Sequence, residues 1–276
     1  MPAHAPPVRL DALPPFHPVV TRLLAELSGE SSGFRRIRLL VSEDPALAAH
    51  VLRLANSALF GCRNKVSDLL TALTLIGLDR LRALVLTYGV RHLFRPLARF
   101  PVCRSIWRHS LATALLAADL SFDNTGDMMD SYTAGLLHDL GRLVLLASAP
   151  ESYPALLEQA ETPEQSCHLE RDAFGLTHAE AGARAMRRYD LPAPLADAAL
   201  LHHHEDPLDL SRQNPAAALI ASSCRLASSS GFPVIRSADR RPETAPGEES
   251  TDDSDDLCLY LRERIAEVEL ELGLSF

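Results

Sequence analysis

The sequence is poor in aromatic residues, which make up 5% of its 276 residues and include a single tryptophan. Strands favour aromatic and β-branched residues, whereas Ala and Leu dominate here, so the composition argues against an all-β fold and favours packed helices. The five cysteines form no CxxC pair and are odd in number. This argues against a disulfide framework and a thiolate zinc knuckle, and we interpret the cysteines as small hydrophobic core residues.

Long apolar runs are also missing. No stretch approaches the roughly 20 unbroken apolar residues of a membrane span, and residues 1–7 lack the charged and apolar regions of a signal peptide. We therefore expect a cytoplasmic protein with no membrane span. The hydrophobic content of 47% is enough for a sizeable core, in one large domain or two small ones.

Charge is unevenly distributed along the chain. Residues 1–110 carry 15 basic and 7 acidic side chains, a net charge of +8, whereas residues 111–276 carry 12 basic and 29 acidic ones, a net charge of −17. A chain with a total charge of −9 is a poor candidate for nucleic-acid binding. Nucleic-acid or nucleotide binding by the arginine-rich first half stays as a minor alternative; its residues are Arg35, Arg36, Arg38, Arg80 and Arg82.

Apolar residues recur with helical period throughout, which predicts about five short helices over residues 10–95. One of them begins after Asp44 with Pro45 in its first turn, and another covers Leu69–Ile76 and ends at Gly77. The sequence predicts an all-α fold, with this five-helix bundle packed against a second helical half.

The second half shows helical patterns that carry histidines. His109 faces inward on one helix, and a further helix over about 132–146 holds His138 and Asp139 in its middle. The T-x-x-E spacing of Thr177 and Glu180 predicts a helix from His178 to about Arg188. Two more helices begin at prolines: Pro192 opens one on which His202 and His203 lie at helical spacing, and Pro215 opens the other.

The composition changes near the end of the chain. Residues 229–256 are rich in Ser, Pro, Gly and acids with little to bury, which predicts a flexible acidic linker. Residues 257–276 are amphipathic and predict a final helix that docks back on the domain.

The inward-facing histidines form the candidate site. An adjacent His-Asp pair with histidines from neighbouring helices could bind one or two metal ions, which would activate water for attack on a phosphate ester. The alternative is a structural core in which carboxylates hold buried histidines by hydrogen bonds. The candidate residues are His109, His138, Asp139, His178, His202 and His203, with His204 as a further candidate.

Several segments carry a resemblance to a known family. Asp44–Leu47, the Asn56-Ser57 element and Ala72–Leu78 in the first half, with Gly135–Leu143 and Phe174–Gly182 in the second, resemble the HDOD domain. HDOD, the HD-related output domain of bacterial signalling, belongs to the superfamily of HD and HD-GYP phosphohydrolases. The resemblance covers residues 10–228, as a bundle over 10–95 and an HD-like half over 100–228.

The resemblance implies roles for individual residues. His109 matches the first metal ligand of the superfamily, His138 and Asp139 match the HD pair, and His178 with His202 and His203 match the further histidines of bimetallic members. The sequence departs from the pattern where the last carboxylate ligand is expected, because Cys224 is the nearest substitute there. A soft thiolate is a poor exchange for a hard carboxylate at an iron, manganese or magnesium site. Arg142 stands where HD hydrolases often carry a lysine near the phosphate.

Two functions follow as expectations. The first is a non-catalytic regulatory module of bacterial signalling that binds signalling proteins and needs no cofactor, in stress, motility or virulence control. The second is a divergent metal-dependent phosphohydrolase or cyclic-nucleotide phosphodiesterase, with His138, Asp139 and Arg142 at its centre and iron, manganese or zinc as cofactor. A nucleotide second messenger is a possible ligand under either function.

Overall fold

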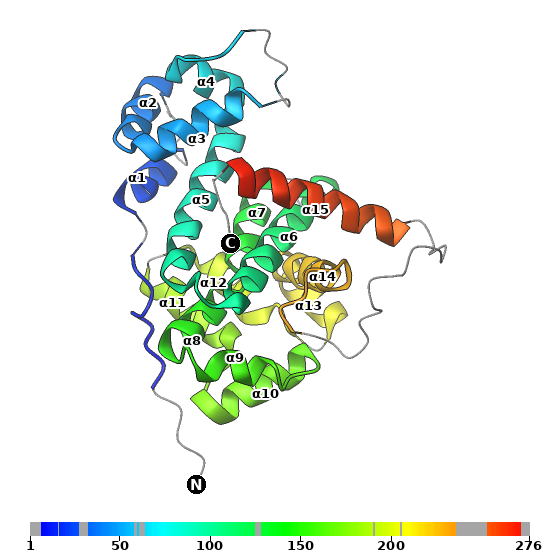
Figure 1. The fold of residues 1–276 in the computed structure, drawn as a ribbon. Coiled ribbons are helices and arrows are strands. Elements are labelled where there is room, and N and C mark those ends of the chain that lie inside the picture. Colours follow the sequence, from blue (N-terminus) through cyan, green and yellow to red (C-terminus); the bar gives the residue numbers. More distant parts are fainter. Residues whose placement is uncertain are drawn as a thin grey trace, which may run out of the picture. The chain divides into compact units, whose positions relative to one another are not determined.

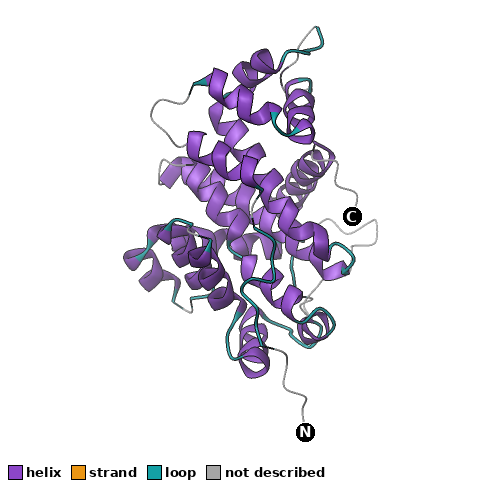
Figure 2. Cartoon of the chain, turned by 90° about the vertical axis from the view of Figure 1, so that its left-hand side faces the viewer, coloured by secondary structure: helices purple, strands orange, loops and turns teal. Residues whose placement is uncertain are grey.

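The computed structural model describes residues 7–15, 17–27, 33–57, 60, 64–124, 128–189, 191–204, 206–235 and 253–271. Every regular element in these ranges is a helix, as Figure 2 shows, which confirms the prediction of an all-α fold. The chain divides into two compact units. We call Pro15–Arg95 with Ala266–Phe276 the smaller unit, and Met1–Pro14 with Pro96–Ile265 the larger unit.

The smaller unit contains the first helices of the chain. They are α1 (Pro18–Leu27), α2 (Phe34–Ser42), α3 (Pro45–Ala55), α4 (Leu69–Ile76) and α5 (Leu78–Phe94), labelled in Figure 1. Asp44 caps α3 as predicted, since its carboxylate accepts from the backbone N–H groups of Ala46 and Leu47. Gly77 ends α4 with a φ of 80°, a conformation that side chains other than glycine rarely adopt.

Asn56 follows α3 and joins it to a more distant part of the same unit. Its side-chain amide donates to the carbonyls of Leu52 and Val66 at 2.7 and 2.8 Å, and its oxygen accepts from the N–H of Val66 at 2.8 Å. These bonds fix where the chain returns before α4. The Asn56-Ser57 element of the sequence therefore has a structural role in the smaller unit.

The larger unit contains the remaining helices, most of them short. They are α6 (Pro101–Asn124), α7 (Met128–Leu137), α8 (Leu140–Ser148), α9 (Ser152–Leu157), α10 (Pro163–Phe174), α11 (His178–Arg188), α12 (Ala193–Leu201), α13 (Pro207–Gln213) and α14 (Pro215–Ser229). A short 3-10 helix, η2 (Arg95–Leu97), precedes α6. The long helix α6 packs on α7 and α14, and its Trp107 is fully buried. The predicted capping box forms at the start of α11, between Thr177 and Glu180.

The end of the chain departs in part from the predicted linker and helix. Most of the predicted linker, residues 236–252, lies outside the described residues. Phe232 and Ile235, in the first part of the predicted linker, are buried in the larger unit. The final helix, α15 (Asp253–Glu271), begins four residues earlier than predicted. Its Leu261 is fully buried, and the Tyr260 hydroxyl donates to Asp119 of α6 at 3.0 Å. Residues 272–276 lie outside the described part.

The contact between α8 and α11 depends on two glycines. A Cβ atom on Gly141 would lie 1.8 Å from the backbone oxygen of His178 and 2.5 Å from the nitrogen of Gly182. Both atoms belong to the backbone of α11, so neither can move aside as a flexible side chain could. Gly141 thus allows α8, which follows directly after Asp139, to lie against the start of α11.

We expect Gly141→Ala to lower the unfolding free energy by about 3 kcal/mol, because the methyl group forces α8 and α11 apart. The gain in helix propensity of about 1 kcal/mol is smaller than this. Gly182→Ala is the matched control, since its nearest contact would be 3.1 Å. Urea unfolding followed by circular dichroism measures the unfolding free energy of both variants. If both lost the same amount, the close approach at Gly141 would not be the cause, and the prediction would be wrong.

No helix in the described part of the chain is both long and apolar enough to cross a membrane.

Candidate functional site

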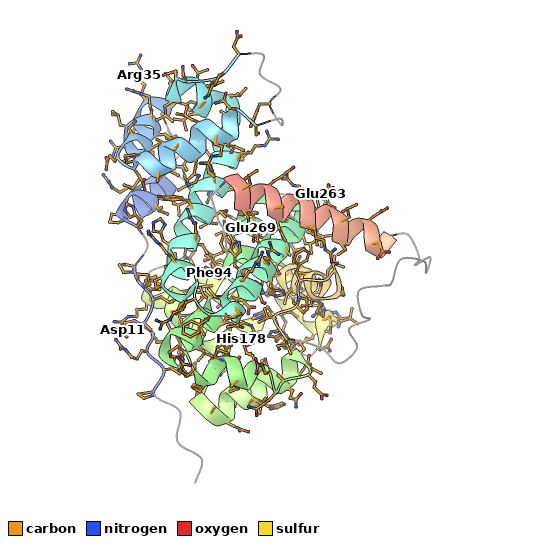
Figure 3. All side chains as sticks on the ribbon, viewed as in Figure 1. Asp11, Arg35, Phe94, His178, Glu263 and Glu269 are labelled. Carbon is orange, nitrogen blue, oxygen red and sulfur yellow. The ribbon has the colours of Figure 1, made fainter. Side chains whose placement is uncertain are left out.

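The larger unit buries one cluster of histidines and carboxylates at the ends of its helices. Each member is at most 2% exposed, and the side chain of His178 lies inside the unit in Figure 3. The members come from α6, from the turn between α7 and α8, from the first turn of α8, from the start of α11 and from the end of α12: His109, His138, Asp139, Arg142, His178 and His202. The structure therefore brings together the candidate residues that the sequence predicts, with His203 beside His178 at 3.1 Å, except for His204, which contacts Asp206.

The prediction of one continuous helix over 132–146 was wrong. The helix breaks at His138 and Asp139, which form the turn between α7 and α8. The ring Nδ1 of His138 donates to the carbonyl of Gly135 at 2.7 Å, so the side chain takes a carbonyl that a continuing helix would use. Histidines commonly bond the last carbonyls of a helix in this way.

The same arrangement ends α12. The helix that Pro192 opens was predicted to carry His202 and His203. Instead, it ends at Leu201, and the two histidines follow it. Nδ1 of His202 donates to the carbonyl of Ala199 at 2.7 Å, three residues back, as His138 does to Gly135. His204 turns away from the cluster, where its Nδ1 accepts from the N–H of Asp206 at 3.2 Å.

The rings of His109, His138 and His202 each direct Nε2 toward the carboxylate of Asp139. His109 also donates through Nδ1 to a carbonyl, that of Phe232, at 2.8 Å. In a neutral imidazole whose Nδ1 carries the proton, Nε2 holds the lone pair. The Nε2 atoms of His109 and His138 each lie 3.8 Å from Oδ2 of Asp139, and that of His202 lies 3.6 Å from Oδ1. Asp139 is therefore the centre of the cluster.

Burial favours the neutral form of four histidine rings, those of His109, His138, His178 and His203. Burial lowers the pKa of His109 and His178, and it lowers the pKa of His138 well below its ordinary value, although Asp139 pulls in the opposite direction. Burial also lowers the pKa of His203, whose Nε2 lies 3.1 Å from Nε2 of His178. A neutral imidazole is the form that binds metal ions.

Asp139 is ionised and already has a cationic partner. Burial alone would raise the pKa of Asp139, but the charge of the Arg142 guanidinium holds it well below its ordinary value. Nε of Arg142 donates to Oδ2 of Asp139 at 3.0 Å, and both side chains are buried. The guanidinium thus neutralises the central carboxylate from within the protein.

Glu170 and Tyr153 complete the cluster, and neither was predicted from the sequence. Oε2 of Glu170 accepts from the backbone N–H and from Nδ1 of His178 at 2.7 and 2.6 Å. Its Oε1 accepts from the Tyr153 hydroxyl at 2.8 Å and lies 3.5 Å from Nη1 of Arg142. Glu170 lies on α10, a helix of largely polar sequence that looks like a surface helix. Thr162-Pro163 and Gly175 could have marked the ends of α10, but no sequence signal separates its buried acid from its exposed ones.

The residues of the cluster fit a metal ion at the His-Asp pair. Oδ1 of Asp139 and Nε2 of His202 are buried without a hydrogen-bond partner, and one ligand atom each of His138, Asp139 and His202 lies within 4.8 Å of the others. The carbonyls that hold Nδ1 of both histidines are the outer contacts found around metal-bound imidazoles. Cys224 lies beside this place, and its sulfur with one ring nitrogen each of His109 and His138 forms another group of ligand atoms within 4.8 Å of one another. Burial raises the pKa of its thiol, which lies 3.4 Å from Nε2 of His109 and can donate to it.

The fold and the cluster define an all-α domain of the HD type, with a His-Asp pair in a helix break surrounded by further histidines. The HDOD domain model matches residues 13–205, so this chain belongs to the HDOD family.

Comparisons with individual proteins agree with this assignment. An uncharacterised protein of Treponema pallidum is 30% identical over 200 residues; these are 71% of this chain, which spans 38% of that protein's length. A crystal structure of an HDOD domain protein of unknown function from Geobacter sulfurreducens has a TM-score of 0.67 at 24% identity, over 96% of this chain and 93% of that one. A protein of Shewanella amazonensis, provisionally named a phosphohydrolase, has a TM-score of 0.64 at 21% identity, over 96% and 87% of the two chains. At these identities the structural likenesses establish the fold alone.

Proposed function

We propose that this protein is a non-catalytic regulatory module of bacterial signal transduction that acts by binding other proteins in the cytoplasm. The observation that carries the proposal is the buried ion pair of Asp139 and Arg142, 3.0 Å apart and each 2% exposed. A hydrolytic site must admit a phosphate ester and use its carboxylate on a metal ion. Here the carboxylate is paired with a guanidinium in a closed cluster, which suits a structural core.

Two further observations support this proposal. Membership of the HDOD family agrees with a signalling role, and a protein of Marinobacter aquaeolei with a TM-score of 0.64 is provisionally named a signal transduction protein. The described cysteines, Cys103, Cys167, Cys224 and Cys258, are free thiols, which agrees with a reducing compartment.

The second candidate is a metal-dependent phosphohydrolase, favoured by the unpartnered Oδ1 of Asp139 and Nε2 of His202. His138, Asp139 and His202 would hold the ion, which when bound would lower the pKa of a water molecule and so supply a nucleophile. The chain's own groups would orient that ion: the carbonyls of Gly135 and Ala199 hold the two imidazoles, and Arg142 fixes Oδ2 of Asp139.

Phosphate release separates the two candidates. We expect the purified full chain, supplied with manganese, iron or zinc, to hydrolyse p-nitrophenyl phosphate and cyclic di-GMP no faster than its Asp139→Asn variant. Asp197→Asn, at an exposed aspartate paired with Arg187, is the matched control. Metal-dependent turnover that is lost in Asp139→Asn and kept in Asp197→Asn, with both variants folded, would establish the hydrolase and overturn the proposal.

A further inference from the structure

A cysteine outside the HD pattern lies beside two histidines at the edge of the cluster. Cys167 comes from α10, His178 begins α11, and His203 follows the end of α12. The Cys167 sulfur and one ring nitrogen from each histidine all lie within 4.8 Å of one another. His178 is fully buried, whereas Cys167 and His203 are half-buried. This group is therefore nearer to solvent than the HD pair.

The histidines of this group are arranged as in zinc proteins. Glu170 accepts from Nδ1 of His178 at 2.6 Å, which leaves the lone pair of His178 on Nε2. A carboxylate that accepts from the far nitrogen of a metal-bound histidine fixes the ring and raises its basicity as a ligand. Nε2 of His203 lies only 3.1 Å from Nε2 of His178, so the two rings direct these nitrogens at each other.

We propose that Cys167, His178 and His203 form a zinc site. One thiolate and two imidazoles are a soft ligand set, typical of zinc and unlike the oxygen-rich sites that magnesium or manganese prefers. Three protein ligands leave the fourth position of a tetrahedral ion for water. On binding, the thiol of Cys167 gives up its proton to solvent and its sulfur binds the ion. This differs from the interpretation of all five cysteines as core hydrophobes.

The site gives α10 a further connection to the rest of the larger unit. Within that unit α10 packs chiefly on α9, and its Glu170 contacts α8 and α11 through Arg142 and His178. A zinc ion would join α10 to α11 and to the end of α12 at one point. The proposal does not depend on the proposed function, because Asp139 is not one of the ligands.

Cobalt substitution tests the site directly, because a cobalt–thiolate bond gives a charge-transfer band in the near ultraviolet. The full chain is stripped with a chelator, dialysed and titrated with Co²⁺, and then with Zn²⁺ to displace it. We expect one equivalent of cobalt with the charge-transfer band, its loss on adding one equivalent of zinc, and a higher melting temperature of the zinc-loaded protein. Both the band and the rise in melting temperature should be absent in Cys167→Ser.

Further variants identify the ligands. His203→Gln should weaken cobalt binding at least tenfold, as is expected for the loss of one ligand, and circular dichroism checks that it is folded. Cys258→Ser is the matched control, since Cys258 is a half-buried free cysteine on α15, and it should keep the band. The proposal would be overturned by any of three results. The native chain could show no band, the band could survive in Cys167→Ser, or the band could be lost in Cys224→Ser instead.

Discussion

Replacing Asp139 by alanine is expected to lower the unfolding free energy by about 3–5 kcal/mol, because it leaves the guanidinium of Arg142 buried next to a cavity. Arg142 is 2% exposed, and its only other carboxylate contact in the described residues is Glu170 at 3.5 Å. Glu170 is already engaged by His178 and Tyr153. Breaking a buried ion pair at one partner costs far more than the pair itself contributes.

Urea unfolding at pH 7.5 measures this loss against two references. Asp197→Ala removes an exposed aspartate that lies 3.3 Å from Arg187, and it should cost less than about 1 kcal/mol. The double variant Asp139→Leu, Arg142→Met replaces both charges by apolar groups and should recover a large part of the stability, since no charge is left unpaired. If Asp139→Ala cost no more than Asp197→Ala, the central position of Asp139 in the cluster would be wrong.

Local signals in the sequence predicted much of the fold. The Asp44 cap, the stop at Gly77 and the capping box of Thr177 and Glu180 all involve bonds between residues at most four positions apart. Such bonds form within one stretch of chain, so the residue types that make them are visible in the sequence. The inward direction of His109 follows in the same way from the apolar stripe of its helix.

The site itself could be predicted only in part. Histidines at 109, 138, 178 and 202 stand out because they lie in apolar surroundings, where polar side chains are unexpected. Phe232 contacts His109 from 123 residues away, and Glu170 contacts His178 and Arg142 from 8 and 28 residues away. Nothing near either residue in the sequence marks it as buried. The breaks at His138 and His202 were missed because helical periodicity is the same whether a histidine continues a helix or bonds the carbonyl that ends it.

Mild acid is expected to destabilise the protein strongly. The pKa values of His109, His138, His178 and His203 are lowered in the folded chain, mainly by burial, whereas in the unfolded chain they return to about 6.5. Below that pH the unfolded state binds protons that the folded state does not. The stability that these histidines contribute is therefore present above about pH 6.5 and is lost as the pH falls toward the folded values.

The size of this effect follows from the number of histidines. Each one that stays neutral in the folded state contributes a slope of up to about 1.4 kcal/mol per pH unit, so four together remove at most about 5 kcal/mol between pH 7.5 and 5.5. Asp139 and Glu170 act in a separate, more acidic window, because their lowered pKa values give stability that is present above about pH 4 and lost below it.

Urea unfolding at pH 7.5, 6.5 and 5.5 gives the slope of the unfolding free energy against pH. This slope is proportional to the number of protons taken up on unfolding. His168→Gln is the matched control, since it removes a histidine of α10 and leaves the four cluster histidines in place, so the steep dependence should persist. An unfolding free energy that stays constant from pH 7.5 to 5.5 would mean that the folded cluster accepts as many protons as the unfolded chain. Its histidines would then be paired as cations with Asp139 and Glu170, not held as neutral rings by backbone carbonyls.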